Sequence, residues 1–74
     1  MYQRIRNLRE DRDLNQTQVA KMLGMSQTGY SKYETGELMP TAENLVILAR
    51  FYNTSLDYLM DLTDEKKPYP PKKI

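Results

Sequence analysis

Residues 14–36 read LNQTQVAKMLGMSQTGYSKYETG, and they contain the boundaries of two short helices. Asn15 is a favourable N-cap, and Gln18 follows it three residues later in the arrangement of a capping box. Gly24 comes where the first helix should end, at a position that favours a left-handed backbone. Ser26 is the next N-cap, only two residues further on. The spacing therefore predicts two helices joined by a tight turn.

The side chains of this stretch also suit two helices that cross closely. Ala20 puts a small side chain on the inner face of the first helix, and Gly24 tolerates the positive φ that a sharp turn needs. Gly36 provides a stop for the second helix. The apolar side chains expected to fill the space between the helices are those of Val19, Leu23, Met25, Tyr30 and Tyr33. We therefore expect a crossed helix pair over about residues 16–34.

Three further helices are expected around this pair. One spans roughly residues 2–12, and a short last helix begins after the N-cap Ser55. Another opens at Pro40-Thr41 and carries an apolar stripe at helical spacing, formed by Leu45, Leu48, Ala49 and Tyr52. No stretch alternates between apolar and polar residues with period two, so no strands are predicted. The expected fold class is all-α, a compact bundle of five helices.

The composition changes at Thr63. Residues 63–74 hold three prolines and four lysines, which cannot pack as a helix, so we expect an extended, mobile and disordered tail. This places one domain at residues 1–62 and a tail at 63–74. The net charge is only +1, but it is uneven: residues 1–35 carry +2 and residues 36–62 carry −3. The asymmetry weakly favours the N-terminal half as the face for a polyanion.

Several function classes have little support in the composition. The chain of 74 residues has no cysteine and no histidine, which excludes disulfides and leaves almost no transition-metal site. Catalysis is not expected, because there is little volume for a pocket and no spacing that suggests an activated nucleophile. No cofactor is expected either. The absence of an apolar run of signal-peptide or membrane-spanning length makes a cytoplasmic protein the default expectation.

The stretch quoted above, followed by Pro40 and a leucine-rich helix, closely resembles the Xre-type, lambda-repressor-like helix-turn-helix family. The resemblance covers about residues 2–62, and the caps, the turn, the stop glycine and the proline all agree in register. Two positions depart from the family pattern. Tyr30 stands where valine or isoleucine is commoner, and Met39 stands where a basic residue often precedes the proline. The first departure requires a larger ring in the core, and the second removes one expected phosphate contact.

The resemblance implies that the second helix of the pair lies in the major groove of DNA. It assigns base reading to Gln27, Thr28 and Lys32, with Ser31 next in line. It assigns contacts with the DNA backbone to Gln16, Thr17, Ser26 and Tyr33. The chemistry agrees, because glutamine can bind adenine bidentately, lysine can reach guanine and a threonine methyl can pack on thymine. The alternative for Gln27, Thr28 and Lys32 is an ordinary solvated helix face.

The resemblance also implies structural roles. Arg9 and Glu34 are expected to form an ion pair between the first helix and the end of the third. Tyr30 and Tyr33 are expected to lie in the core rather than to stack on bases. Gly29 is expected on the exposed side, where it would let the helix approach DNA closely.

Two classes of function remain open. The first is a stand-alone transcriptional regulator, a bacterial or phage repressor that binds a palindromic operator. The second is an antitoxin-like module whose tail wraps a partner protein. For the first, we expect a weak homodimer that forms mainly on DNA, through apolar residues of the last helix and beyond, namely Leu56, Met60 and Leu62.

Overall fold

The computed structural model of this chain describes residues 3–68. They form five helices, α1 (Gln3–Asp11), α2 (Gln16–Met22), α3 (Gln27–Thr35), α4 (Ala42–Phe51) and α5 (Leu56–Leu59). None of these residues lies in a strand. The predicted all-α class and the number of helices are therefore confirmed, with helix ends within a residue or two of those expected from the sequence.

The predicted N-caps start four of the five helices. The Asn15 side chain accepts a hydrogen bond from the Gln18 N–H, and the Gln18 side chain accepts one from the Asn15 N–H, both at 2.8 Å. Together they complete the capping box of α2. The side chains of Ser26, Thr41 and Ser55 cap α3, α4 and α5 in the same way, each accepting from the N–H three residues later.

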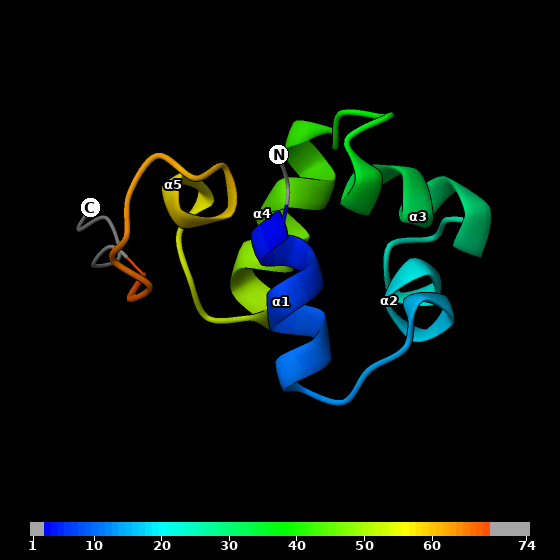
Figure 1. Cartoon of the computed structure of the whole chain (residues 1–74), viewed down its shortest axis with the longest axis horizontal. Coiled ribbons are helices and arrows are strands. Elements are labelled where there is room, and N and C mark those ends of the chain that lie inside the picture. The colour runs from blue at the N-terminus through cyan, green and yellow to red at the C-terminus, as the bar shows by residue number, and fades with distance from the viewer. Residues whose placement is uncertain (1–2, 69–74) are drawn as a thin grey trace.

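Helices α1 and α4 occupy the centre of the molecule, with α2 and α3 on one side and α5 on the other (Figure 1). Helix α3 packs against both α1 and α2, and α5 packs against both α1 and α4. One core joins all five helices: Ile5, Leu8, Val19, Ala20, Leu23, Tyr30, Tyr33, Leu45, Leu48, Ala49, Tyr52 and Leu59 are buried. Because α3 contributes two tyrosine rings to this core, its remaining face is turned outwards.

The predicted tail departs from expectation over its first residues. Arg4 on α1 donates to the carbonyl oxygen of Thr63 and forms an ion pair with Asp64 at 2.9 Å. In the link between α4 and α5, the Thr54 hydroxyl donates to the Lys66 carbonyl oxygen at 2.6 Å. Residues 63–66 are therefore held against the domain by side chains that are distant in sequence. The rest of the tail, from residue 69, lies outside the described residues.

Within residues 3–68, none of the helices has the length and hydrophobicity of a membrane-spanning segment.

Candidate nucleic-acid interface

The turn between α2 and α3 sets the direction in which α3 points. Gly24 has φ +69°, and the Met25 N–H donates to the Ala20 carbonyl oxygen at 2.8 Å, which closes the end of α2. A Cβ built at Gly24 would have no heavy atom within 4 Å. The glycine is therefore required by the left-handed backbone and not by lack of space. Ala20 is 1% exposed, as its expected place between the two helices requires.

The outer face of α3 carries the residues expected to read bases. Gln27, Thr28 and Lys32 are exposed, and Ser31 is half-buried. Tyr30 lies on the opposite face and is completely buried. The structure thus places all four expected base-reading residues on α3, and three of them are exposed.

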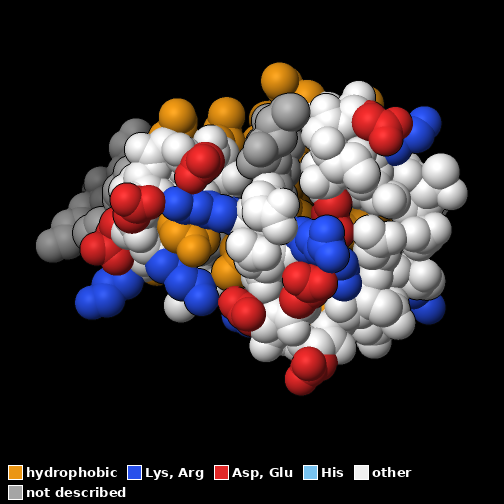
Figure 2. All heavy atoms as spheres, in the orientation of Figure 1, with side chains coloured by type: hydrophobic (Ala, Val, Ile, Leu, Met, Phe, Trp, Pro, Cys, Tyr) orange, Lys and Arg blue, Asp and Glu red, His pale blue; other side chains and the backbone are white. Residues whose placement is uncertain are grey.

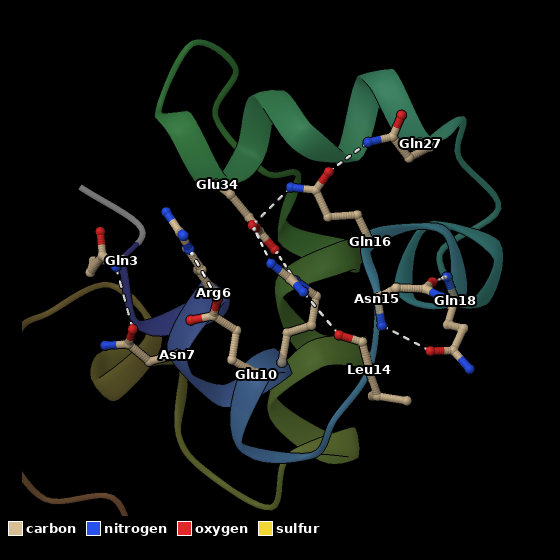
Figure 3. Close-up of polar contacts among 11 residues, drawn as sticks. Gln3, Arg6, Asn7, Glu10, Leu14, Asn15, Gln16, Gln18, Gln27 and Glu34 are labelled. Carbon is tan, nitrogen blue, oxygen red and sulfur yellow. Dashed lines mark hydrogen bonds and ion pairs between the residues drawn. The ribbon is translucent and has the colours of Figure 1, made fainter.

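A chain of hydrogen bonds links the exposed end of α3 to the interior (Figure 3). Gln27 Nε2 donates to Gln16 Oε1 at 2.5 Å, and Gln16 Nε2 donates to Glu34 Oε1 at 3.0 Å. Glu34 in turn accepts from Arg9, with Nε to Oε2 at 2.6 Å and Nη2 to Oε1 at 3.1 Å. Arg9 also donates to the Leu14 carbonyl oxygen at 2.9 Å. Helices α1, α2 and α3 therefore meet through one polar network.

This network orients the side-chain amide of Gln27. Its nitrogen is turned towards Gln16, and its oxygen has no partner among residues 3–68. The amide can therefore still accept one hydrogen bond through its oxygen and donate one through the second hydrogen of its nitrogen. A glutamine held in this way presents a fixed acceptor–donor pair instead of a freely rotating group.

The Arg9–Glu34 pair expected from the sequence is confirmed, and it is largely shielded from water. The Arg9 side chain is 12% exposed and that of Glu34 is 4% exposed. Burial acts to raise the pKa of Glu34, but hydrogen bonds from its neighbours outweigh this effect, and its pKa lies below the ordinary value. The carboxylate is therefore ionised at neutral pH and can hold both Arg9 and Gln16.

Two tyrosine hydroxyls lie buried in the core near this pair. The Tyr52 hydroxyl has no hydrogen-bond partner within the described part of the chain, whereas the Tyr30 hydroxyl faces the Glu34 carboxylate closely enough to affect its pKa without reaching good hydrogen-bond geometry. Burial raises the pKa of both phenols, and that of Tyr52 reaches about 12. Tyr30 is the residue that replaces the smaller aliphatic side chain of the family pattern, so its hydroxyl is a polar atom that this chain has added to the core.

Not all of the residues that were expected to contact the DNA backbone lie at the protein surface. Gln16 is half-buried, and Thr17 and Ser26 are exposed. Tyr33, by contrast, is only 2% exposed, and its hydroxyl accepts a hydrogen bond from Asn44 Nδ2 at 2.8 Å. Its expected role as a backbone contact is therefore corrected, because the spacing that turns Tyr30 inwards also turns Tyr33 inwards.

Gly29 is the third residue of α3. It is half-buried, and a Cβ at this position would lie 3.1 Å from the Ser26 Oγ and 3.4 Å from the Met25 Cε. Ser26 Oγ also accepts from the Gly29 N–H at 3.0 Å, so an added Cβ would crowd this N-cap. The close approach of Gly29 to DNA stays a prediction.

Sequence reasoning named Gln16, Gln27 and Glu34 separately but missed the hydrogen bonds that join them. Gln27 and Glu34 lie two turns apart on α3, but Gln16 lies on α2, so only the crossing of α2 and α3 brings the three side chains together. The face seen in Figure 2 carries basic and acidic side chains side by side, without a broad basic field. Any affinity of this surface for a polyanion must therefore come from individually placed groups.

A family model described as Helix-turn-helix matches residues 5–59 of this chain. The chain belongs to the helix-turn-helix family. This helix-turn-helix chain is 39% identical over 71 residues to the uncharacterised HTH-type transcriptional regulator YobD of Bacillus subtilis, covering 96% of this chain and 63% of that protein. It is 42% identical over 67 residues to the cryptic phage CTXphi transcriptional repressor RstR of Vibrio cholerae, covering 88% and 60%. The chain thus spans about three fifths of the length of these relatives.

The helix-turn-helix domain also has a solved structural neighbour. The P22 c2 repressor, in a crystal structure with synthetic operator 9T, matches it with a TM-score of 0.74 and 34% identity, covering 82% of this chain and 92% of that one. The family expected from residues 14–36 is confirmed by both kinds of comparison. The relatives named here are a transcriptional regulator and phage repressors, so they give no support to the antitoxin-like alternative.

Proposed function

We propose that this chain is a sequence-specific DNA-binding transcriptional regulator, and that it acts as a repressor at its operator. The observation that carries the proposal is the exposed Gln27 amide at the start of α3, which hydrogen bonds through Gln16 to the buried Glu34 hold in place. The repressors among its relatives and the operator-bound P22 c2 repressor support the same function. The proposed function requires no catalytic step and no cofactor. The proposed location is the cytoplasm.

Helix α3 enters the major groove with its N-terminal half against the bases. The Gln27 amide matches adenine, because its oxygen can accept from N6 while its remaining N–H donates to N7. The Thr28 methyl can pack on a thymine methyl, and Lys32, about one turn after Thr28, can donate to guanine O6 or N7. Ser31 is half-buried between these positions and takes the secondary place.

The backbone contacts of the proposal come from polar groups that flank α3. Thr17 and Ser26 are exposed, and Gln16 keeps one N–H beyond its bond to Glu34. These groups would hold neighbouring phosphates and fix the depth of α3 in the groove. Tyr33 is not among them, because it lies in the core.

The experiment begins with selection of a cognate duplex from a random library by the purified protein. Gln27→Ala should then weaken binding to that duplex by about 1–3 kcal/mol and leave binding to a scrambled duplex unchanged, because only base contacts carry sequence information. Thr17→Ala is the control, and it should weaken both duplexes alike. Equal losses on the two duplexes for Gln27→Ala would remove its assignment as a base reader.

The proposal includes two copies of the chain on a palindromic operator. One short recognition helix contacts few base pairs, and helix-turn-helix dimers double the site with half-sites about 34 Å apart. Leu56, Met60 and Leu62 are 39%, 42% and 70% exposed at and after α5, which supports them as contacts between copies. Light scattering should find two protomers on a full palindrome and mostly monomer in free solution; one protomer on a saturated palindrome would overturn this part of the proposal.

A further inference from the structure

A polar cleft of about 430 Å³ lies beside the row of glutamines, where α1 meets α2 and the end of α3. Its lining consists of Gln3, Arg6, Arg9, Gln16, Glu34 and Thr35. Figure 3 shows Arg6 and Gln27 on opposite sides of Gln16, with the Glu34 carboxylate between Arg6 and Gln16. The cleft therefore continues the candidate DNA surface from α3 towards α1.

The inner half of the cleft is already neutralised by its own contacts. Both oxygens of Glu34 accept hydrogen bonds, from Arg9 and from Gln16, and the carboxylate is shielded from solvent. Arg9 uses its remaining terminal nitrogen on the Leu14 carbonyl oxygen. The buried charges thus balance each other, and neither is available to an incoming group.

The outer half is different, because Arg6 is a cation with unused donors. Its side chain is 54% exposed, and its ion pair with Glu10 involves only Nε, at 3.4 Å. Its two terminal nitrogens have no partner within residues 3–68. Exposed pairs of this kind, four residues apart on one helix, contribute little, so Arg6 can leave Glu10 at small cost.

We propose that this cleft binds a phosphate of the DNA backbone, with Arg6 as its charged ligand. The proposal rests on the proposed function, and it extends the DNA surface to α1. A guanidinium can hold a phosphate through two parallel N–H donors, which a half-exposed arginine at the mouth of a cleft is free to present. Gln3 and Thr35 add polar atoms to the rim, and the paired Arg9 and Glu34 add no net charge to oppose the phosphate.

The test measures how DNA affinity depends on salt for wild type, Arg6→Gln and Arg50→Gln. Arg50 is the matched control, because it is an exposed arginine that lines a different groove, between α4 and α5. Each phosphate contact contributes about 0.9 to the slope of log K against log salt. Arg6→Gln should lower this slope by about 0.9 on cognate and scrambled duplexes alike. When the salt is reduced from 1 M to 0.1 M, the affinity of the variant should therefore rise roughly eightfold less than that of the wild type.

Arg50→Gln should leave the slope nearly unchanged, and Arg6→Lys should keep most of the wild-type slope, because it keeps the charge. Equal slopes for Arg6→Gln and Arg50→Gln would overturn the proposal for the cleft. That outcome leaves the proposed function intact as long as the wild type still prefers its cognate duplex. Failure of the wild type to prefer any duplex would overturn the proposed function instead. Thermal melting of each variant confirms that the slopes are measured on folded protein.

Discussion

Among single residues, Tyr52 and Tyr33 form an instructive pair in the core. Both rings are 2% exposed, but the Tyr33 hydroxyl accepts from Asn44 whereas the Tyr52 hydroxyl has no partner within the described residues. A buried polar group without a hydrogen bond costs about 1–3 kcal/mol. Tyr52→Phe should therefore raise the free energy of unfolding by about 1 kcal/mol, and Tyr33→Phe should lower it by a similar amount, as measured by urea melts. Destabilisation by both changes would show that the Tyr52 hydroxyl is hydrogen-bonded after all.

The Arg9–Glu34 pair makes a prediction that depends on pH. At pH 7, Glu34→Gln should lower the free energy of unfolding by about 3 kcal/mol, the lower end of the cost of breaking a buried pair. The folded pKa of Glu34 lies below its ordinary value of 4.5, so its contribution is complete above pH 4.5 and is lost as the pH falls through the folded pKa. A double-mutant cycle with Arg9→Gln should therefore give strong coupling at pH 7 and weaker coupling in acid. Coupling that does not change with pH would mean that the carboxylate charge is not responsible.

At the scale of elements, the link between α2 and α3 determines whether the candidate interface exists. The caps start each helix locally, but only the left-handed backbone at Gly24 turns α3 across α2. This crossing places Gln16 beside Gln27 and Glu34, and thereby creates the row of hydrogen bonds. The geometry of one turn is thus a condition for the orientation of a proposed base reader.

Substitution of Gly24 tests this dependence. Gly24→Ala should lower the free energy of unfolding by about 1–2 kcal/mol through backbone strain alone, because the added Cβ meets no neighbouring atom. Gly24→Asn should cost less, since asparagine tolerates the left-handed region better than alanine. Urea melts of the two variants provide the measurement. An equal cost for alanine and asparagine would point to a contact of the new side chain and not to strain.

At the scale of the whole molecule, Arg4 ties the two ends of the described chain together. Its side chain is 19% exposed, its Cζ lies 4.2 Å from the centre of the Tyr58 ring, and it pairs with Asp61 at 3.0 Å as well as with Asp64. With the Thr54 bond to Lys66, these contacts hold the segment after α5 at two points. In a domain this small, such long-range contacts form a noticeable part of the stability.

Truncation should reveal the contribution of this segment. A chain that ends at Leu62 loses the partners of Arg4 and Thr54 in residues 63–66, and we expect its free energy of unfolding to fall by about 1–2 kcal/mol. A chain that ends at Pro68 keeps these contacts and is the control. Thr54→Val in the full chain should reproduce part of the loss, because it removes the hydrogen bond to Lys66 alone. Equal stability of the two truncated chains would show that the contacts contribute nothing measurable.

Short-range patterns along the chain were enough to predict the helices and the family. The N-caps Asn15, Ser26 and Ser55 act through hydrogen bonds to residues three positions later. The spacing of apolar residues indicates which face of a helix is buried. Both features can therefore be recognised from the sequence. The pairing of Arg9 with Glu34 was expected from the family resemblance and their opposite charges, and the structure confirms it. The assignment of base readers on α3 stays a prediction.

The tertiary structure alone decided what depends on contacts between distant residues. It placed Tyr33 in the core, oriented Gln27 through Gln16, and held residues 63–66 through Arg4 and Thr54. The physical reason is the same in each case. A side-chain hydrogen bond or ion pair depends on a separation of a few ångströms between atoms whose distance along the chain has no fixed relation to it. Composition made residues 63–66 look like part of a free tail, because it records which residues are present and not that Arg4 of α1 and Thr54 of the α4–α5 link donate to them.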